Sequence, residues 1–177
     1  DPGSMYWRYA DAVGYYEGVP AERQIGTLGY VEAELTTRVD VPGSCFNYAS
    51  YLTNLLPVAV ARAYGRPAVE LYEERIYRHI GVESHAIVNL DRFGNPIVEG
   101  QVSLRLRDFA RWAYLFMNSG RSLGGEHVVP PSWIAECFGS DPERRAAFAR
   151  SDYADLMPGA EYHNQGWLLG PEVGTLA

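Results

Sequence analysis

The chain has 177 residues, of which 47% are hydrophobic, so it carries enough apolar material to build one globular unit with its own core. Twenty-two acidic residues against fifteen basic ones give a formal net charge of −7, and the two signs are interspersed. This balance argues against a nucleic-acid-binding protein, which needs a basic stripe, and the absence of a run of about twenty apolar residues argues against a membrane span.

The N-terminal segment and the lysine content bear on the compartment of the protein and on its chemistry. The first 24 residues have neither the basic flank nor the apolar stretch of a secretory signal, so the sequence leaves the compartment open between cytoplasm and periplasm. Every basic residue is arginine, so the 177 residues contain no lysine. This absence limits the chemistry that the chain can perform by itself.

The N-terminal half predicts a loop region followed by helices. Residues 1–26 show no sustained period and are expected to form a surface loop region with short helical turns. A helix is predicted over 27–39 and a second over 50–64, which Gly65 ends in a left-handed conformation. Pro57 predicts a kink or break in the second helix. Its buried stripe is expected to contain Leu52, Leu55, Leu56, Ala59, Val60 and Ala63.

The middle of the chain predicts a helix and a strand pair. Pro67 at a first helical turn starts a third helix, which Gly81 ends. Short strands are expected at 87–90 and 96–98, on either side of a turn at 91–95.

The last third predicts two more helices and a strand. The apolar face over 108–118, closed by Gly120, is typical of an amphipathic helix, and Pro130 and Pro131 start another. A strand is expected at 162–169. We therefore predict a mainly α chain with a few short strands. It would be one partial domain over 1–177, with a helical domain at 27–160 and the start of a sheet region at 161–177.

A tyrosine placed just before a helix is the first candidate for chemistry. Tyr48 lies in Phe46-Asn47-Tyr48-Ala49-Ser50, which follows the turn Val41-Pro42-Gly43. Nearby positive charge would favour its phenolate and make it a proton shuttle, and Ser50 could bond the same substrate. Taken alone, the pattern fits better an aromatic anchor whose hydroxyl finds a surface partner.

Three segments in the same order carry a resemblance to a known family. Pro42-Gly43-x-x-Phe46-x-Tyr48-x-Ser50 resembles the second catalytic element of the β-lactamase-related serine hydrolases, the group of class C β-lactamases and 6-aminohexanoate-dimer hydrolases. Gly100-Gln101-Val102-Ser103 to Asp108-Phe109-Ala110-Arg111 is similar to a helix start of that family. A third similar segment runs from Gly124-Gly125 through Val128-Val129 to Trp133-Ile134.

The resemblance implies a fold and a set of roles. This chain would correspond to the helical domain of the β-lactamase/DD-peptidase-like α+β fold, with an active site in the cleft beside an α/β domain. In that family the serine of Ser-x-x-Lys attacks the substrate, while lysine and tyrosine move protons. The resemblance assigns Tyr48 as general base or proton relay, Ser50 as a substrate-binding residue and Trp167 as a residue lining the substrate cleft. It implies a small amide, ester or β-lactam substrate and no cofactor.

The chain departs from the family at the nucleophile. No serine is followed three residues later by lysine. The C-terminal His/Lys-x-Gly strand of the family is also missing, since His127 is followed by Val128-Val129 and His163 by Asn164-Gln165. Arginine cannot replace the missing lysine as a base, because it stays protonated. We therefore expect the chain to be the internal part of a longer hydrolase, inert by itself, whose remaining segments supply the nucleophile.

Two other readings stay open. The chain could be a non-catalytic relative that uses the cleft around Tyr48 for binding, or a helical interaction module, which a Tyr48 buried in the core would favour. Taken by itself, Trp167 fits a core residue better than a cleft residue. The scattered histidines and the two cysteines, Cys45 and Cys137, predict no metal site and no disulfide framework.

Overall fold

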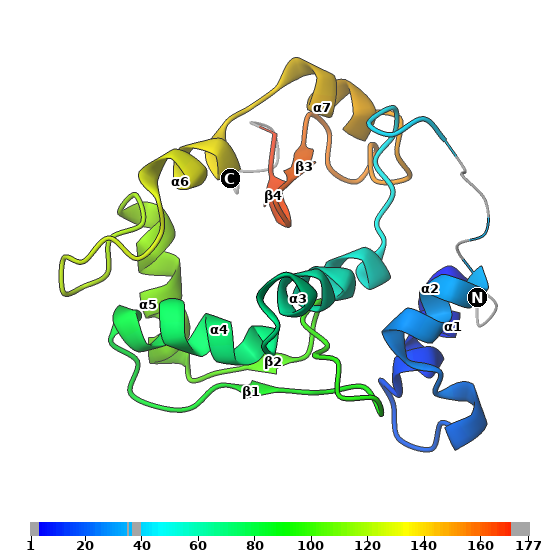
Figure 1. Cartoon of the computed structure of the whole chain (residues 1–177). Coiled ribbons are helices and arrows are strands. Elements are labelled where there is room, and N and C mark those ends of the chain that lie inside the picture. The colour runs from blue at the N-terminus through cyan, green and yellow to red at the C-terminus, as the bar shows by residue number, and fades with distance from the viewer. Residues whose placement is uncertain (1–3, 35, 37–39, 171–177) are drawn as a thin grey trace. The chain divides into compact units, whose positions relative to one another are not determined.

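The computed structural model describes residues 4–34, 36 and 40–170 of the chain (Figure 1). Contacts between residues divide it into two compact units. The described part of the first unit comprises residues 4–34, 36 and 49–129, and that of the second comprises 40–48 and 130–170. Within these residues there are seven α-helices and four short strands, which confirms the mainly α fold class.

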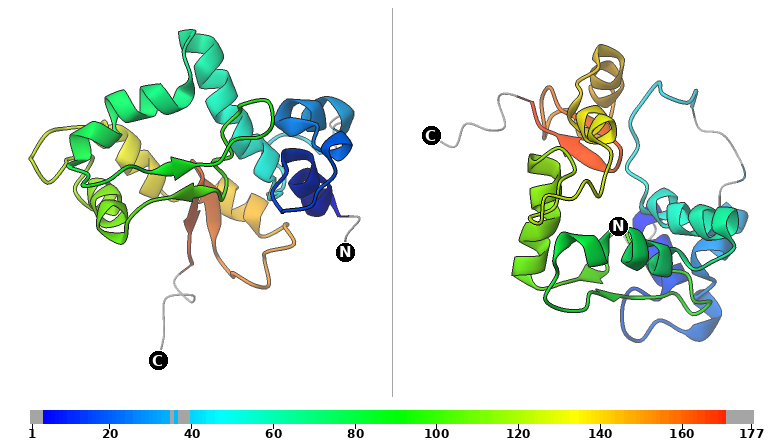
Figure 2. Two further views of the ribbon diagram at one scale, coloured as in Figure 1. Left: turned by 90° about the horizontal axis from the view of Figure 1, so that it is seen from below. Right: turned by 60° about the vertical axis from the view of Figure 1, so that its left-hand side comes forward.

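The first unit contains five of the α-helices and one strand pair. Its elements are α1 (Met5–Val13), the 3-10 helix η1 (Ala21–Arg23), α2 (Gly26–Glu34), α3 (Ser50–Tyr64), α4 (Ala68–Arg75), the 3-10 helix η2 (Tyr77–Ile80), β1 (Ile87–Val88), β2 (Val102–Ser103) and α5 (Leu106–Met117). The region expected to be a loop thus holds a nine-residue helix, α1, which packs beside α2 (Figures 1 and 2). Its C-terminus is capped by Gly14 in a left-handed conformation.

A cluster of tyrosines forms the core between α1, α2 and α3. Tyr9, Tyr30 and Tyr51 are each less than 10% exposed, with ring centroids 5.0 to 6.0 Å apart. Apolar side chains such as Val13 and Ile97 complete the cluster. The predicted helix over 27–39 ends at Glu34 in the structure, since Thr36 is not helical and 35 and 37–39 lie outside the described residues.

Asn54 ties the three helices to the loop after β1. Its side chain is fully buried, and its Nδ2 donates to the Tyr9 hydroxyl at 2.6 Å. That hydroxyl lies 3.1 Å from the Thr27 hydroxyl. The Asn54 Oδ1 accepts from the backbone amides of Val98 and Glu99 at 2.8 and 3.1 Å. Both polar atoms of the amide group therefore have hydrogen-bond partners, which allows a polar residue to lie in the core.

The expected buried stripe of α3 is wrong. The buried residues of this helix are Ser50, Tyr51, Asn54 and Val58, whereas Leu52 and Leu56 are each 49% exposed. The physical reason is that the hydrogen bonds of Asn54 offset the cost of burying its amide. Helix α3 continues through Pro57, so the expected break there is wrong, and Gly65 ends the helix with φ of +65° as predicted.

A second core in this unit joins η2 to α5. Ile80 and Leu115 are almost fully buried there, and the predicted third helix is divided into α4 and η2 because Ile76 leaves the helical conformation. Gly81 ends η2 with φ of +75°. Helix α5 begins at Leu106, two residues before its predicted start.

The turn at 91–95 forms as predicted, but the second strand is displaced. The Asp91 Oδ1 accepts from the amides of Phe93 and Asn95, each at 2.9 Å, and an isolated bridge joins Leu90 to Pro96. The partner of β1 is β2 at Val102–Ser103, not the expected 96–98. The reason is that the amides of Val98 and Glu99 bond to Asn54 and are withdrawn from strand pairing.

The second unit contains α6 (Pro131–Phe138), α7 (Pro142–Phe148), β3 (Glu161–His163) and β4 (Gly166–Leu168). The expected strand at 162–169 is a hairpin, because Asn164 and Gln165 both have positive φ, as in the tight turns that join antiparallel strands. The hairpin lies beside α7 in both views (Figures 1 and 2). Helix α7 was not predicted, although Asp141 caps its N-terminus by accepting from the Glu143 amide at 2.7 Å.

Candidate functional site

The segment before Tyr48 is held against the end of α7. The Val41-Pro42-Gly43 turn is closed by the Ser44 amide, which donates to the Val41 carbonyl at 3.0 Å, with Gly43 at φ of +84°. The Phe46 amide then donates to the Ala147 carbonyl at 3.1 Å, and Arg150 Nε donates to the Ser44 carbonyl at 2.6 Å. These bonds fix the direction in which the chain presents Tyr48 within the second unit.

Tyr48 belongs to a group of six aromatic rings that we call the Tyr48 cluster. Its members are Phe46, Tyr48, Phe148, Tyr153, Tyr162 and Trp167. Tyr48 stacks on Trp167 with a centroid distance of 5.6 Å and an interplanar angle of 25°. The ring centroid of Tyr153 lies 6.0 Å from that of Tyr48 and 5.5 Å from that of Trp167. The structure thus brings together two of the three predicted site residues.

The exposure of Tyr48 bears on one of the alternatives left open by the sequence. Tyr48 is 39% exposed, so it is not a residue buried in the core, which was the feature that would have favoured a purely helical interaction module. Trp167 is half-buried, with part of its ring accessible. A phenol supported on one side by rings and open on the other can meet a ligand from solvent.

The environment of the cluster keeps the phenol of Tyr162 neutral. Burial raises the pKa of Tyr162, and the nearby Tyr48 phenol raises it further. Below the cluster, Glu161 is 2% exposed and accepts from the Asp141 amide at 2.8 Å. Burial alone would raise the pKa of Glu161, but hydrogen bonds from Ser140, Asp141 and Arg145 outweigh it, so the pKa lies below its ordinary value. Glu161 therefore anchors the hairpin as a carboxylate.

Ser50 lies at the start of α3 in the first unit. It is 9% exposed and stands one helical turn before Asn54. The chain passes from the second unit to the first between Tyr48 and Ser50, so the structure describes each of these side chains within its own unit. Asn54 was missed from the sequence, and a polar residue in a leucine-rich helix four residues after Ser50 was the signal that could have found it.

Metal-ligating side chains do not gather in the described parts of the chain. Among residues 4–34, 36 and 40–170, no group of three or more His, Cys, Asp or Glu could hold a metal ion. His79 lies 3.0 Å from a carboxylate oxygen of Glu126, and His163 lies 3.2 Å from one of Glu136. In the same residues, no helix has the length and apolar character needed to cross a membrane.

Comparisons with known proteins agree with the motifs. No family model matches the chain. Over 142 residues the chain is 27% identical to the 6-aminohexanoate-dimer hydrolase of Paenarthrobacter ureafaciens, a match that covers 80% of this chain and 36% of that protein.

Two solved structures share the fold. A proposed 6-aminohexanoate-dimer hydrolase from Bacillus anthracis matches with a TM-score of 0.72 and 21% identity, over 90% of this chain and 39% of that chain. A proposed β-lactamase from Bacteroides dorei DSM 17855 matches with a TM-score of 0.58 and 24% identity, over 81% of this chain and 43% of that chain.

Proteins described as 6-aminohexanoate-dimer hydrolases occur in both the sequence and the structure comparison, and a proposed β-lactamase occurs in the structure comparison. The chain is therefore similar in sequence to a hydrolase and similar in fold to two proteins described as hydrolases. The chain spans less than half the length of each of these three relatives.

Proposed function

We propose that this chain is part of a serine hydrolase that cleaves a small amide, ester or β-lactam bond through an acyl-enzyme. Two findings support the proposal: the similarity to a 6-aminohexanoate-dimer hydrolase over 80% of the chain, and the position of Tyr48. The position of Tyr48 carries it, because the tyrosine of the family motif stacks on Trp167 and keeps 39% of its surface accessible. In this proposal, residues 27–160 correspond to the helical domain of the family.

Each site residue has a role in the proposed reaction. The serine hydroxyl of a Ser-x-x-Lys element outside these 177 residues attacks the carbonyl carbon, and Tyr48 passes the serine proton to the leaving amine or alcohol. Water then attacks the acyl-enzyme and releases the acid. Trp167 supplies a flat apolar surface for the substrate. Ser50 keeps the substrate-binding role that the family motif gives it.

The first test uses the chain alone. Because it contains no lysine and no Ser-x-x-Lys motif, we expect no turnover of nitrocefin, a p-nitrophenyl ester or 6-aminohexanoate dimer above the buffer rate. Clear turnover of any of these by the purified 177 residues would show that the nucleophile lies within them, contrary to the proposal.

The second test uses a longer protein that contains these residues and a Ser-x-x-Lys element. Tyr48→Phe is expected to lower kcat by about 10²-fold or more, on the scale of losing a positioned acid-base group. Tyr153→Phe is the matched control, because it removes a hydroxyl from the same cluster without touching the proposed proton relay. Equal kcat values for the two variants would remove Tyr48 from the mechanism.

The alternative is a non-catalytic relative that binds a small molecule at the Tyr48 cluster. Tyr48 and Trp167 would then form the binding surface, since Tyr48 stacks on Trp167 and is 39% exposed. The encoding gene distinguishes the two: a Ser-x-x-Lys element upstream and a His/Lys-x-Gly strand downstream in the same reading frame support the hydrolase, and an open reading frame without them supports the binding protein.

A further inference from the structure

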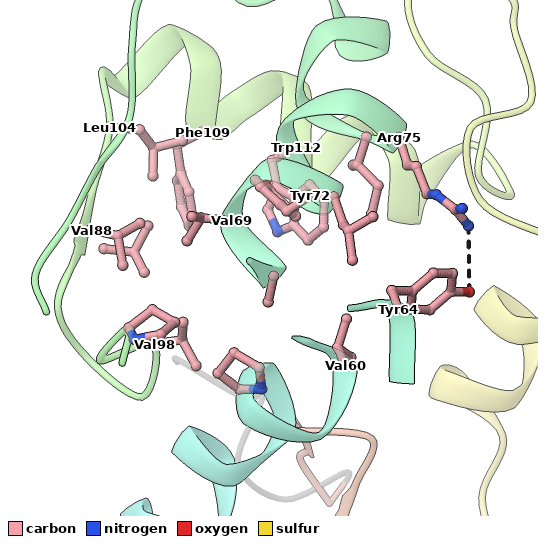
Figure 3. Close-up of a pocket in the computed structure, with 16 residues that line it drawn as sticks. Val60, Tyr64, Val69, Tyr72, Arg75, Val88, Val98, Leu104, Phe109 and Trp112 are labelled. Atoms are coloured by element: carbon pink, nitrogen blue, oxygen red, sulfur yellow. Dashed lines mark hydrogen bonds between the residues drawn. The ribbon is translucent and has the colours of Figure 1, made fainter. Parts of the chain in front are cut away.

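The first unit contains a large cavity that the proposed reaction does not use. It has a volume of about 720 Å³ and is lined by residues of α3, α4, α5 and the β1–β2 region (Figure 3). Its volume lies in the range of small-molecule sites, which is about 300–1,000 Å³. Several lining side chains are open to solvent, among them Val60 at 40% and Phe109 at 54% exposure. A ligand can therefore enter without unfolding the unit.

The walls of the cavity are almost entirely apolar. Aliphatic and aromatic side chains, such as Val69, Val98 and Trp112, make up fifteen of its sixteen lining residues. Burial raises the pKa of Tyr72 to about 12, so this phenol is neutral at neutral pH and adds no charge. The walls therefore suit a hydrocarbon chain.

Arg75 is the one charged residue in the lining. Figure 3 shows it beside Tyr64, with Val88, Leu104 and Phe109 on the opposite side of the cavity. Its guanidinium carbon lies 4.8 Å from the centre of the Tyr64 ring, and its Nη1 donates to the Tyr64 hydroxyl at 3.5 Å. A guanidinium has five N–H donors, so most of the donors of Arg75 stay available for an anion.

The acidic residues of α4 do not neutralise Arg75. Glu70 and Glu74 pair with Arg66, and Glu73 pairs with Arg78. None of these glutamates lines the cavity, and within the described residues no carboxylate forms an ion pair with Arg75. The charge at this end of the cavity is therefore positive, and it complements an anionic head group.

We propose that this cavity binds an elongated aliphatic carboxylate, with the hydrocarbon chain against the apolar walls and the carboxylate on the guanidinium of Arg75. An alkyl ammonium would bring a second positive charge to Arg75, and an alcohol offers the guanidinium one uncharged oxygen as acceptor where a carboxylate offers two charged ones. The proposal concerns the first unit alone and is independent of the hydrolase activity.

Displacement of a neutral apolar dye tests the proposal. N-phenyl-1-naphthylamine is bound to the purified 177-residue chain and displaced with decanoate, decanol or decyltrimethylammonium, which share a straight alkyl chain and differ in charge. We expect decanoate to bind about 10-fold more tightly than the other two, the scale of one charge-assisted hydrogen-bonded pair. Equal affinities for the three compounds would overturn the proposal, as would an absence of dye binding.

Two variants locate the site and its charge. Arg75→Gln is expected to reduce decanoate binding about 10-fold while leaving dye binding unchanged. Arg62→Gln is the matched control, since Arg62 is exposed on α3 and does not line the cavity. Val60→Asp is expected to abolish dye binding. Equal effects of the two arginine variants would refute the assigned role of Arg75.

Sedimentation velocity over a range of protein concentrations tests whether a second copy of the chain, and not a carboxylate, fills the cavity. The proposal expects decanoate to bind the monomer. A dimer that Val60→Asp dissociates and decanoate does not would show that a second copy fills the cavity, and would overturn the proposal.

Discussion

Replacing Asn54 by leucine tests the buried network that joins α1, α2 and α3. Leucine has the same branching and the same number of side-chain heavy atoms as asparagine, so the change removes hydrogen bonds while it keeps the shape of the side chain. The variant loses the acceptor for the Val98 and Glu99 amides and the donor to the Tyr9 hydroxyl. The Tyr9 hydroxyl keeps its contact with Thr27.

The expected cost follows from the groups left without partners. A buried donor that loses its acceptor costs about 1–3 kcal/mol, and Asn54→Leu leaves two backbone donors in this state. Val98 and Glu99 are half-buried, so water can reach part of this segment and lower the cost. We expect the free energy of unfolding of the first unit to fall by about 2–4 kcal/mol.

Hydrogen exchange measures this loss within the first unit. In Asn54→Leu, the opening free energy for exchange of the amides of α1 and α3 should fall by about 2–4 kcal/mol. Amides of α7, in the other unit, serve as a reference. Tyr9→Phe, which removes one hydroxyl from the same network, is expected to cost only about 1 kcal/mol. An Asn54→Leu cost that is no larger than the Tyr9→Phe cost would refute the reasoning.

Three further predictions concern single residues. Gly120 has φ of +81° and a Cβ there would overlap the Val129 carbonyl oxygen, so Gly120→Ala is expected to cost about 2–4 kcal/mol in urea unfolding. Gly125→Ala, at φ of +84° with nothing within 4 Å, should cost only about 1–2 kcal/mol, and equal losses would contradict the clash. The pKa of Glu161 is lower in the folded state than the ordinary 4.5, so its stabilisation is present above that pH and is lost as the pH falls through the folded value. Glu161→Gln should therefore flatten the decline in stability between about pH 5 and pH 3, followed by tryptophan fluorescence, and an unchanged acid profile would be evidence against it. Trp167→Ala removes the ring stacked on Tyr48 and should lower the free energy of unfolding of the second unit by about 2–4 kcal/mol, measured by near-UV circular dichroism during urea unfolding.

Local signals in the sequence were sufficient where a residue acts on its own neighbours. Gly65 and Gly81 end their helices because glycine adopts a positive φ without the strain that a Cβ causes. The turn at 91–95 forms because the carboxylate of Asp91 bonds to amides two and four residues later. These features depend on a few consecutive residues, so the sequence alone predicts them.

The motif around Tyr48 could also be recognised from the sequence, because the order of three segments along the chain resembles that of a known family. The residues that Tyr48 contacts could not be predicted from the sequence. Its partners Tyr153 and Trp167 come from distant parts of the chain, and the fold of the second unit brings them together.

Only the tertiary structure decided which face of α3 is buried. Hydrophobicity favoured the leucines, yet Leu52 and Leu56 are half exposed and Asn54 is fully buried. A polar side chain can be buried only where other elements supply its hydrogen-bond partners, and Tyr9, Val98 and Glu99 supply them across the fold. The sequence by itself determined the glycine ends of α3 and η2, the turn at 91–95 and the family likeness, since these follow from local order. The buried network, the Tyr48 cluster and the cavity beside Arg75 depend on contacts between distant residues, which only the folded chain creates.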